Sequence, residues 1–161
     1  MGARYLCADV GGTQIKAAVL EETGEPAGDI ERFEARSGLP RDALLGHLAG
    51  CLASAAGKGG VRGVRLAMPG PFDYENGICL IDGLGKYAAL YGTDLRAELG
   101  TRLRGALGAA AEDIRFINDV AGGGSGGAGG RLHLPAAAAR TACGRLALAP
   151  RALRAEPPPA G

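Results

Sequence analysis

Several residue types and patterns are scarce in this 161-residue sequence. It has no Trp, and aromatic residues make up 4% of it. No apolar run approaches the roughly 20 residues that a membrane span requires. The formal net charge of +1 is too small to favour a nucleic-acid surface. The N-terminal MGARYLCADV lacks the features of a signal peptide. We therefore expect a cytoplasmic protein with no membrane or nucleic-acid partner.

Cysteine is also rare. The four residues Cys7, Cys51, Cys79 and Cys143 lie far apart and form no CxxC pair, which disfavours a structural zinc site or a disulfide framework. Cys7 and Cys51 sit inside apolar patterns, so we expect them to be small core residues. The sequence predicts no metal site built from these thiols.

Residues 121–161 lack Val, Ile, Lys and every aromatic residue. They hold 12 Ala, 9 Gly, 5 Arg and 5 Pro, a composition that favours disorder. The sequence therefore predicts two units, a folded domain over 1–120 and a low-complexity tail over 121–161. The tail is either genuine or the product of a truncation or frame shift after residue 119, because GC-rich codons specify these residues in any frame.

The first 120 residues carry the patterns of an α/β domain. Apolar or alternating runs predict strands, and Leu residues at helical spacing predict two helices. Three antiparallel strands followed by β-α-β crossovers predict a mixed sheet with flanking helices. The expected strands cover 4–10, 15–20, 29–36, 61–68, 78–82 and 113–119; one helix begins with Pro40 as its first residue and ends before Gly57, and the other begins near Thr93 or Asp94.

The segment DVGGTQIK (9–16) places a carboxylate at the end of a strand, just before a glycine turn. Gly11 and Gly12 would let the main chain turn with positive φ and approach a ligand closely. Thr13 offers a hydroxyl and Lys16 a charge for phosphate, and Asp9 could hold Mg²⁺ through water. The alternative interpretation is a plain hairpin, since Gly-Gly turns are common.

Three further segments carry polar or rigid groups. FIND ends a strand in Asn118 and Asp119, and an Asp there could accept a proton from a sugar hydroxyl, or it could simply open a turn. The rigid bend 69–71, with Gly70 and Pro71, could form one wall of a small-ligand pocket or be an ordinary loop. Lys86, Tyr87 and Tyr91 suit hydroxyl-rich ligands, or are exposed surface residues.

Together and in this order, these segments resemble the ROK family of sugar kinases and regulators, over about 1–119. ADVGGTQIKAAVLEETGE resembles its N-terminal phosphate loop and hairpin, GVRLAMPGPFDYENG its PGP loop, and FIND its NDA segment. The resemblance implies an α/β fold, the ribonuclease-H-like N-terminal lobe of the actin-like ATPase superfamily, with a mixed five-stranded sheet.

The resemblance also implies residue roles. Asp119 would be the catalytic base, with Asn118, Gly70 and Pro71 beside the sugar. Asp9, Gly11, Gly12, Thr13 and Lys16 would face the phosphates of ATP and Mg²⁺. The implied reaction is phosphoryl transfer from ATP to a hexose, and intact relatives could form homodimers.

The sequence departs from the family after FIND. No glutamate of the type A.a..lGE follows, and nothing resembles the GTGIG loop, the Cys/His zinc motif or the adenosine-binding lobe. Because phosphoryl transfer depends on positioning ATP and acceptor together, we expect this chain to be inactive alone. The alternatives are a non-catalytic sugar-binding module and a regulator, although Asp9 leaves no room before it for a helix-turn-helix domain.

Overall fold

The computed structural model describes residues 2–83 and 85–118. The predicted tail, Cys143, Val120 and the proposed base Asp119 lie outside the described residues. In chain order the elements are β1 (Arg4–Val10), β2 (Gln14–Glu21), β3 (Glu31–Glu34), α1 (Arg41–Ala56), β4 (Gly63–Met68), β5 (Phe72–Asp73), β6 (Ile78–Cys79), the 3-10 turn η1 (Ala88–Leu90), α2 (Leu95–Leu107), the 3-10 turn η2 (Gly108–Glu112) and β7 (Ile114–Asn118).

Five strands form one mixed sheet in the order β3-β2-β1-β4-β7, which confirms the predicted fold class. β1, β2 and β3 are antiparallel neighbours, whereas β4 pairs with β1 in parallel and β7 with β4 in parallel. The parallel pairs follow from the helices between them, since a parallel connection needs a long crossover. β4, a strand inside the sheet, is buried at all six positions.

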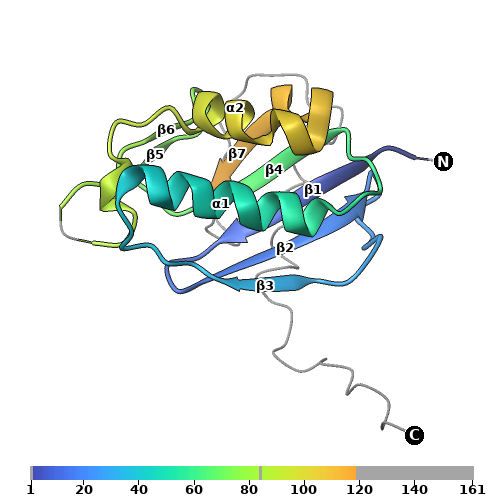
Figure 1. The fold of residues 1–161 in the computed structure, drawn as a ribbon, viewed down its shortest axis with the longest axis horizontal. Helices are drawn as coiled ribbons and strands as arrows, with labels where there is room; N and C mark the ends of the chain where they lie inside the picture. The colour runs from blue at the N-terminus through green and yellow to red at the C-terminus, as the bar shows by residue number, and fades with distance from the viewer. Residues whose placement is uncertain (1, 84, 119–161) are drawn as a thin grey trace, which may run out of the picture.

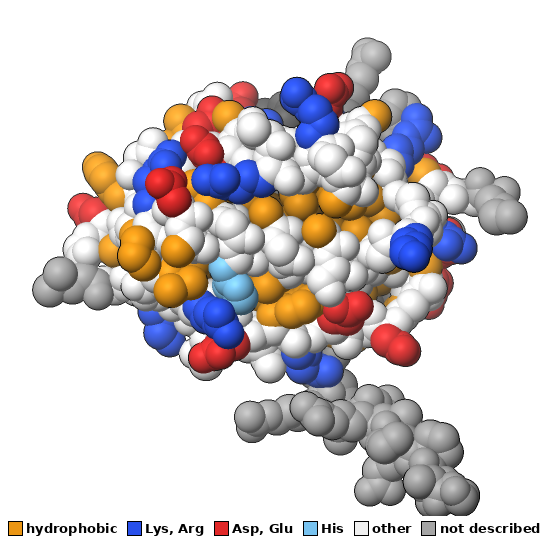
Figure 2. All heavy atoms as spheres, viewed as in Figure 1, with side chains coloured by type: hydrophobic (Ala, Val, Ile, Leu, Met, Phe, Trp, Pro, Cys, Tyr) orange, Lys and Arg blue, Asp and Glu red, His pale blue; other side chains and the backbone are white. Residues whose placement is uncertain are grey.

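Both helices lie on the same face of the sheet, side by side in front of the strands in Figure 1. Alternate residues of β1 point to this face, and they pack against the Leu residues that α1 and α2 present to them. In Figure 2 apolar side chains form a band across this side of the molecule, with charged side chains around it. The opposite face carries a second buried cluster made of strand residues alone, Tyr5, Cys7, Ala18, Leu20 and Ala67.

The predicted elements occur with small shifts at their ends. We predicted that Pro40 is the first helical residue, which is wrong. Pro40 has an extended ψ of 155° and its carbonyl accepts from the Leu44 amide, so it directly precedes the helix. Asp94 accepts from the Ala97 amide at 3.0 Å and thereby begins α2. The predicted short strand near residue 78 is β6, which pairs with β5 in a separate two-stranded sheet.

Cys7 and Cys51 are buried, as predicted. Burial raises the pKa of the Cys51 thiol and of the Cys79 thiol, so both remain protonated at neutral pH. Within 2–83 and 85–118, no helix has the length and apolar character to cross a membrane.

Candidate functional site

The strand register collects most of the candidate residues at one edge of the sheet. Asp9 of β1 is aligned with Ala67 of β4, and Met68 is aligned with Asn118 at the end of β7. β1, β4 and β7 are parallel to one another, so their carboxyl ends meet at this edge. In open α/β sheets this edge is where ligands bind. The turn after β1, the bend after β4 and Asn118 therefore lie at the edge where a ligand site is expected.

The turn formed by residues 11–13 joins β1 to β2, and each of its three carbonyl groups accepts a hydrogen bond from a distant part of the chain. The Gly11 carbonyl accepts from the Tyr87 hydroxyl at 2.6 Å. The Gly12 carbonyl accepts from Ser37 Oγ at 2.9 Å, and the Thr13 carbonyl from the Ala35 amide at 2.9 Å. The 11–13 turn is thus bound to the protein through its acceptors.

This anchoring sets the direction of the amide groups. In a trans peptide the N–H points away from the C=O of the same unit. The Gly12 amide therefore points away from Tyr87, and the Thr13 amide points away from Ser37. Neither amide donates to a main-chain carbonyl of residues 2–83 or 85–118. Successive amides in a turn can bind an anion, which makes the Gly12 and Thr13 amides candidates for such a site.

The glycines of the turn are required for close approach rather than for an unusual backbone. We predicted positive φ at Gly11 and Gly12, which is wrong, since the described glycines with positive φ do not include them. A Cβ on Gly11 would lie 2.7 Å from the Gln14 carbonyl oxygen, and one on Gly12 would lie 2.7 Å from Lys86 Cδ. A side chain at either position would displace a neighbouring group.

Asp9 and Lys16 lie at the base of the turn. They are directly opposite each other in the antiparallel register of β1 and β2, so their side chains project from the same face of the sheet. Burial, and to a smaller extent the charges of Asp9 and Cys51, raise the pKa of the Tyr87 hydroxyl. Tyr87 therefore stays protonated and donates to Gly11, with the Asp9 carboxylate within electrostatic reach.

A magnesium ion would find one suitable ligand here. Among the described residues no group of three or more His, Cys, Asp or Glu side chains could hold a metal. Mg²⁺ in phosphate sites usually keeps several waters and takes one or two carboxylates plus the phosphates. Asp9, half-buried and two residues before the turn, fits that limited role.

The bend after β4 and the end of β7 complete this edge. Gly70 and Pro71 are exposed, and their peptide bond is cis. The Tyr74 hydroxyl donates to the Met68 carbonyl at 2.9 Å and so holds the bend close to the end of β4. Asn118 is exposed at the last position of β7. The roles of Gly70, Pro71, Asn118 and Asp119 in sugar binding remain predictions.

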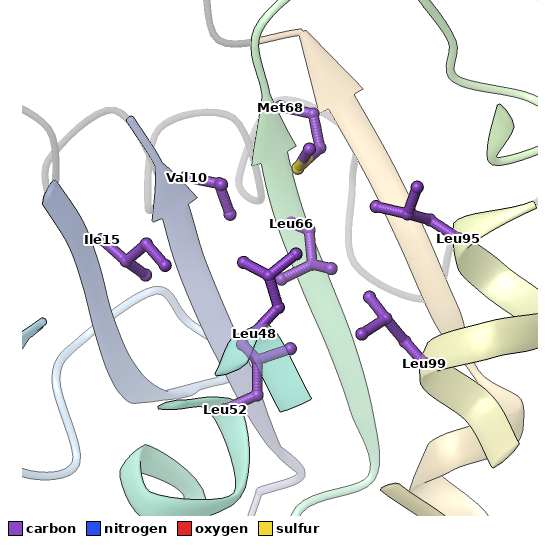
Figure 3. A pocket seen from close by; sticks show the side chains of 8 residues that line it. All are labelled: Val10, Ile15, Leu48, Leu52, Leu66, Met68, Leu95 and Leu99. Carbon is purple, nitrogen blue, oxygen red and sulfur yellow. The ribbon is translucent and has the colours of Figure 1, made fainter. Parts of the chain in front are cut away.

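An apolar pocket lies beneath the turn, between the sheet and both helices. In Figure 3 the strand and helix side chains that line it point toward one another. Val10 and Ile15, which flank the 11–13 turn, are among them. The turn is therefore fixed at both ends to the apolar core. The lining residues are Val10, Ile15, Leu48, Leu52, Leu66, Met68, Leu95 and Leu99.

Sequence reasoning missed the partners of the turn. Ser37 was not singled out, and Tyr87 was expected at a ligand or on the surface, whereas it is fully buried and bonded to the main chain. Tyr91, by contrast, is 58% exposed. No local pattern marks such contacts, since they join residues 25 and 76 positions apart.

No protein-family model and no curated protein matches the chain. Solved structures do match. They include a glucokinase from Parabacteroides distasonis (25% identity, TM-score 0.56) and a ROK family glucokinase from Streptomyces griseus in complex with glucose and AMPPNP (18%, TM-score 0.58). A ROK family transcriptional regulator, a homologue of the E. coli MLC protein, also matches (21%, TM-score 0.54).

These matches cover 73% or 74% of this chain but only 28–33% of the three solved chains. The structural neighbours are thus ROK glucokinases and sugar kinases, with one ROK regulator among them. The extent of the match is consistent with an N-terminal lobe of that fold.

Proposed function

We propose that the chain is the phosphate-binding first lobe of an ATP-dependent sugar kinase. The observation that supports this best is the 11–13 turn, whose carbonyls are bound by the protein while two amides point outward at the carboxyl edge of the sheet. A fold similar to that of a glucokinase complexed with glucose and AMPPNP agrees with this ligand class.

Within this proposal the residues divide into two groups. Gly11, Gly12 and Thr13 face the phosphates of ATP, with Lys16 and Asp9 at their base. Gly70, Pro71 and Asn118 contact the sugar from the neighbouring strand ends. Bound Mg²⁺ would neutralise phosphate charge, and Asp9 is the residue that would hold it.

Asp119 is proposed as the general base that accepts the proton of the attacking sugar hydroxyl. It follows Asn118 directly, and β7 ends at the same edge as β1 and β4. Such transfers depend mainly on positioning both reactants, and the chain spans about a third of the solved kinases. We therefore expect weak ATP binding and little turnover by this chain.

The proposal is tested by isothermal titration calorimetry of the whole chain with Mg-ATP and with glucose. We expect Mg-ATP binding that Asp9→Asn weakens by about tenfold, the effect of losing one charged contact. Asp29→Asn, which removes an exposed carboxylate from the loop between β2 and β3, is the matched control and should leave binding unchanged. Equal affinities for all three proteins would contradict the assignment of Asp9.

The base assignment has its own test. In a kinase of this fold that spans both lobes, Asn in place of the aspartate corresponding to Asp119 should reduce turnover by about 10²–10⁴-fold. ATP affinity should remain largely intact. Equal loss of turnover and of ATP affinity would count against a base at this position.

A non-catalytic, sugar-responsive function is the second candidate, because a ROK transcriptional regulator shares the fold at a TM-score of 0.54. It predicts that the chain binds glucose and gives no response to Mg-ATP. The same calorimetric titrations therefore separate the two candidates.

A further inference from the structure

Lys86 joins the 11–13 turn from a distant part of the chain. Its Nζ donates to Thr13 Oγ1 at 3.0 Å, across 73 residues of sequence. Tyr87, the next residue, is bound on both sides: its hydroxyl donates to the Gly11 carbonyl and its amide to the Ser37 carbonyl at 3.0 Å. The position of Lys86 is therefore set by a fully buried neighbour.

The Lys86–Thr13 hydrogen bond fixes the role of the hydroxyl. An ammonium group has three donors and no acceptor, so Thr13 Oγ1 must be the acceptor in this pair. The Thr13 hydroxyl hydrogen is then left to donate elsewhere. Lys86 thus orients Thr13 as a donor on the same turn whose Gly12 and Thr13 amides point outward.

Lys86 and Lys16 lie in different electrostatic environments. Lys16 lies directly opposite the Asp9 carboxylate in the sheet. Lys86 is exposed and has no carboxylate within 4.0 Å among residues 2–83 and 85–118. Two of its three donors are not needed for Thr13. An anion at the turn would therefore meet a cation that no described acid neutralises.

We propose that Lys86 is a phosphate-binding residue of this site. Its ammonium group binds phosphate directly, and it orients the Thr13 hydroxyl as a donor. The ligand class is the polyphosphate chain of a nucleotide. The inference rests on the proposed function in assuming that the 11–13 turn binds phosphate. It adds a second cation, supplied by the segment before α2.

This role is tested by titrating the whole chain with tripolyphosphate while the amide NMR signals of residues 11–13 are monitored. We expect Lys86→Met to weaken binding by about tenfold, the typical effect of one charge-assisted hydrogen bond. Lys86→Arg should retain most of the affinity because it keeps the charge. Lys58→Met is the matched control, since it removes the same charge from an exposed loop beside Arg4, at the opposite end of β1.

The outcomes separate this inference from the proposed function. If Lys86→Met and Lys58→Met bind equally well while the 11–13 signals still respond, Lys86 is not a ligand and the phosphate turn stands. If tripolyphosphate leaves the Gly12 and Thr13 signals of the wild-type chain unchanged, both proposals are overturned.

Discussion

The two ends of the central sheet use polar groups in opposite ways. At the amino end, buried Arg65 donates to Asp113 Oδ2 at 3.1 Å and to the Asp113 carbonyl at 3.1 Å. Arg115 binds the other carboxylate oxygen at 3.0 Å, and the Arg65 guanidinium lies 4.8 Å from the Tyr5 ring centre. At the carboxyl end, the Tyr87 and Ser37 hydroxyls bind the Gly11 and Gly12 carbonyls, and the Gly12 and Thr13 amides point away from them.

This difference predicts that the polar groups at one end of the sheet contribute to stability and those at the other end to ligand binding. At the amino end the Asp113 carboxylate pairs with Arg65 and Arg115, and removing it leaves the buried Arg65 guanidinium without its acidic partner. At the carboxyl end, Lys86 and the Gly12 and Thr13 amides belong to the proposed phosphate site, and no described carboxylate pairs with Lys86. Substitutions at the amino end should therefore alter the free energy of unfolding, and those at the carboxyl end mainly ligand affinity.

The largest effect is expected from Gly63→Ala at the amino end. The added Cβ would lie 2.6 Å from Asp113 Oδ2 and 3.0 Å from the Asp113 carbonyl oxygen, a main-chain atom that cannot move freely. We expect the free energy of unfolding to fall by about 3 kcal/mol in urea denaturation. Gly46→Ala, in an open position of α1, is the control and should be neutral or stabilising. Similar stabilities of both variants would contradict the packing described for Gly63.

Asp113→Asn should lower the free energy of unfolding by about 2 kcal/mol, less than for a fully buried pair because Asp113 is partly exposed. Glu112→Gln, at the exposed neighbouring position, should change it little. Tripolyphosphate affinity should be the same in both variants. A loss of affinity in Asp113→Asn would show that the two ends of the sheet are coupled.

The contribution of Asp113 should depend on pH. Burial raises the pKa of this carboxyl, but the hydrogen bonds and charges of Arg65 and Arg115 outweigh burial and hold it below its ordinary value. The unfolded state then binds more protons in this range, so the stabilisation is complete above the unfolded pKa of about 3.9 and is lost as pH falls through the lower folded pKa. Urea denaturation should show a constant difference between wild type and Asp113→Asn from pH 7 to about 5. A difference that persists unchanged at the lowest pH would contradict this.

Tyr87→Phe tests the anchoring of the 11–13 turn. Loss of the hydrogen bond to Gly11 should reduce the free energy of unfolding by about 1 kcal/mol and weaken tripolyphosphate binding, because the Gly12 amide loses its fixed direction. Tyr91→Phe, at an exposed position, is the control and should change neither property. Unaltered affinity in Tyr87→Phe would mean that the turn keeps its geometry without this bond.

The smallest effect on stability is expected from Gly12→Ala. The added Cβ would meet Lys86 Cδ at 2.7 Å, but that flexible side chain can move away, so the cost should stay within about 0.5 kcal/mol. Tripolyphosphate affinity should nevertheless fall, since Lys86 leaves Thr13. In the double variant with Lys86→Met the two losses in affinity should not add. Additive losses would show that Gly12 and Lys86 act separately.

Much of the fold could be predicted from local pattern. A continuous apolar run predicted β1, and the Leu spacing predicted α1 and α2, because burial of a strand or a helix face leaves a regular trace in sequence. The pairing of β5 with β6 was missed, since two-residue strands carry no periodic signal. Pro40 was placed one residue too far into α1 because Pro is compatible with both positions at the start of a helix.

The candidate site was predicted only in part, for a similar reason. Asp9, Gly11, Gly12 and Thr13 are adjacent in sequence, so their motif can be recognised without a structure. Lys86 and Tyr87 reach the turn through contacts between distant segments. Tyr87 was considered for its polar tip alone, although its ring is fully buried.

The sequence by itself therefore determined the order of the elements, the glycine turn after β1 and the polar ends of the strands. Only the tertiary structure decided which polar groups of the 11–13 turn are hydrogen-bonded to the rest of the protein. The Tyr87 and Ser37 hydroxyls hold two carbonyls and so direct two amides outward, and Lys86 makes Thr13 a donor. The physical reason is that a hydrogen bond between distant residues depends on how the elements pack, and this packing has no local signal in the chain.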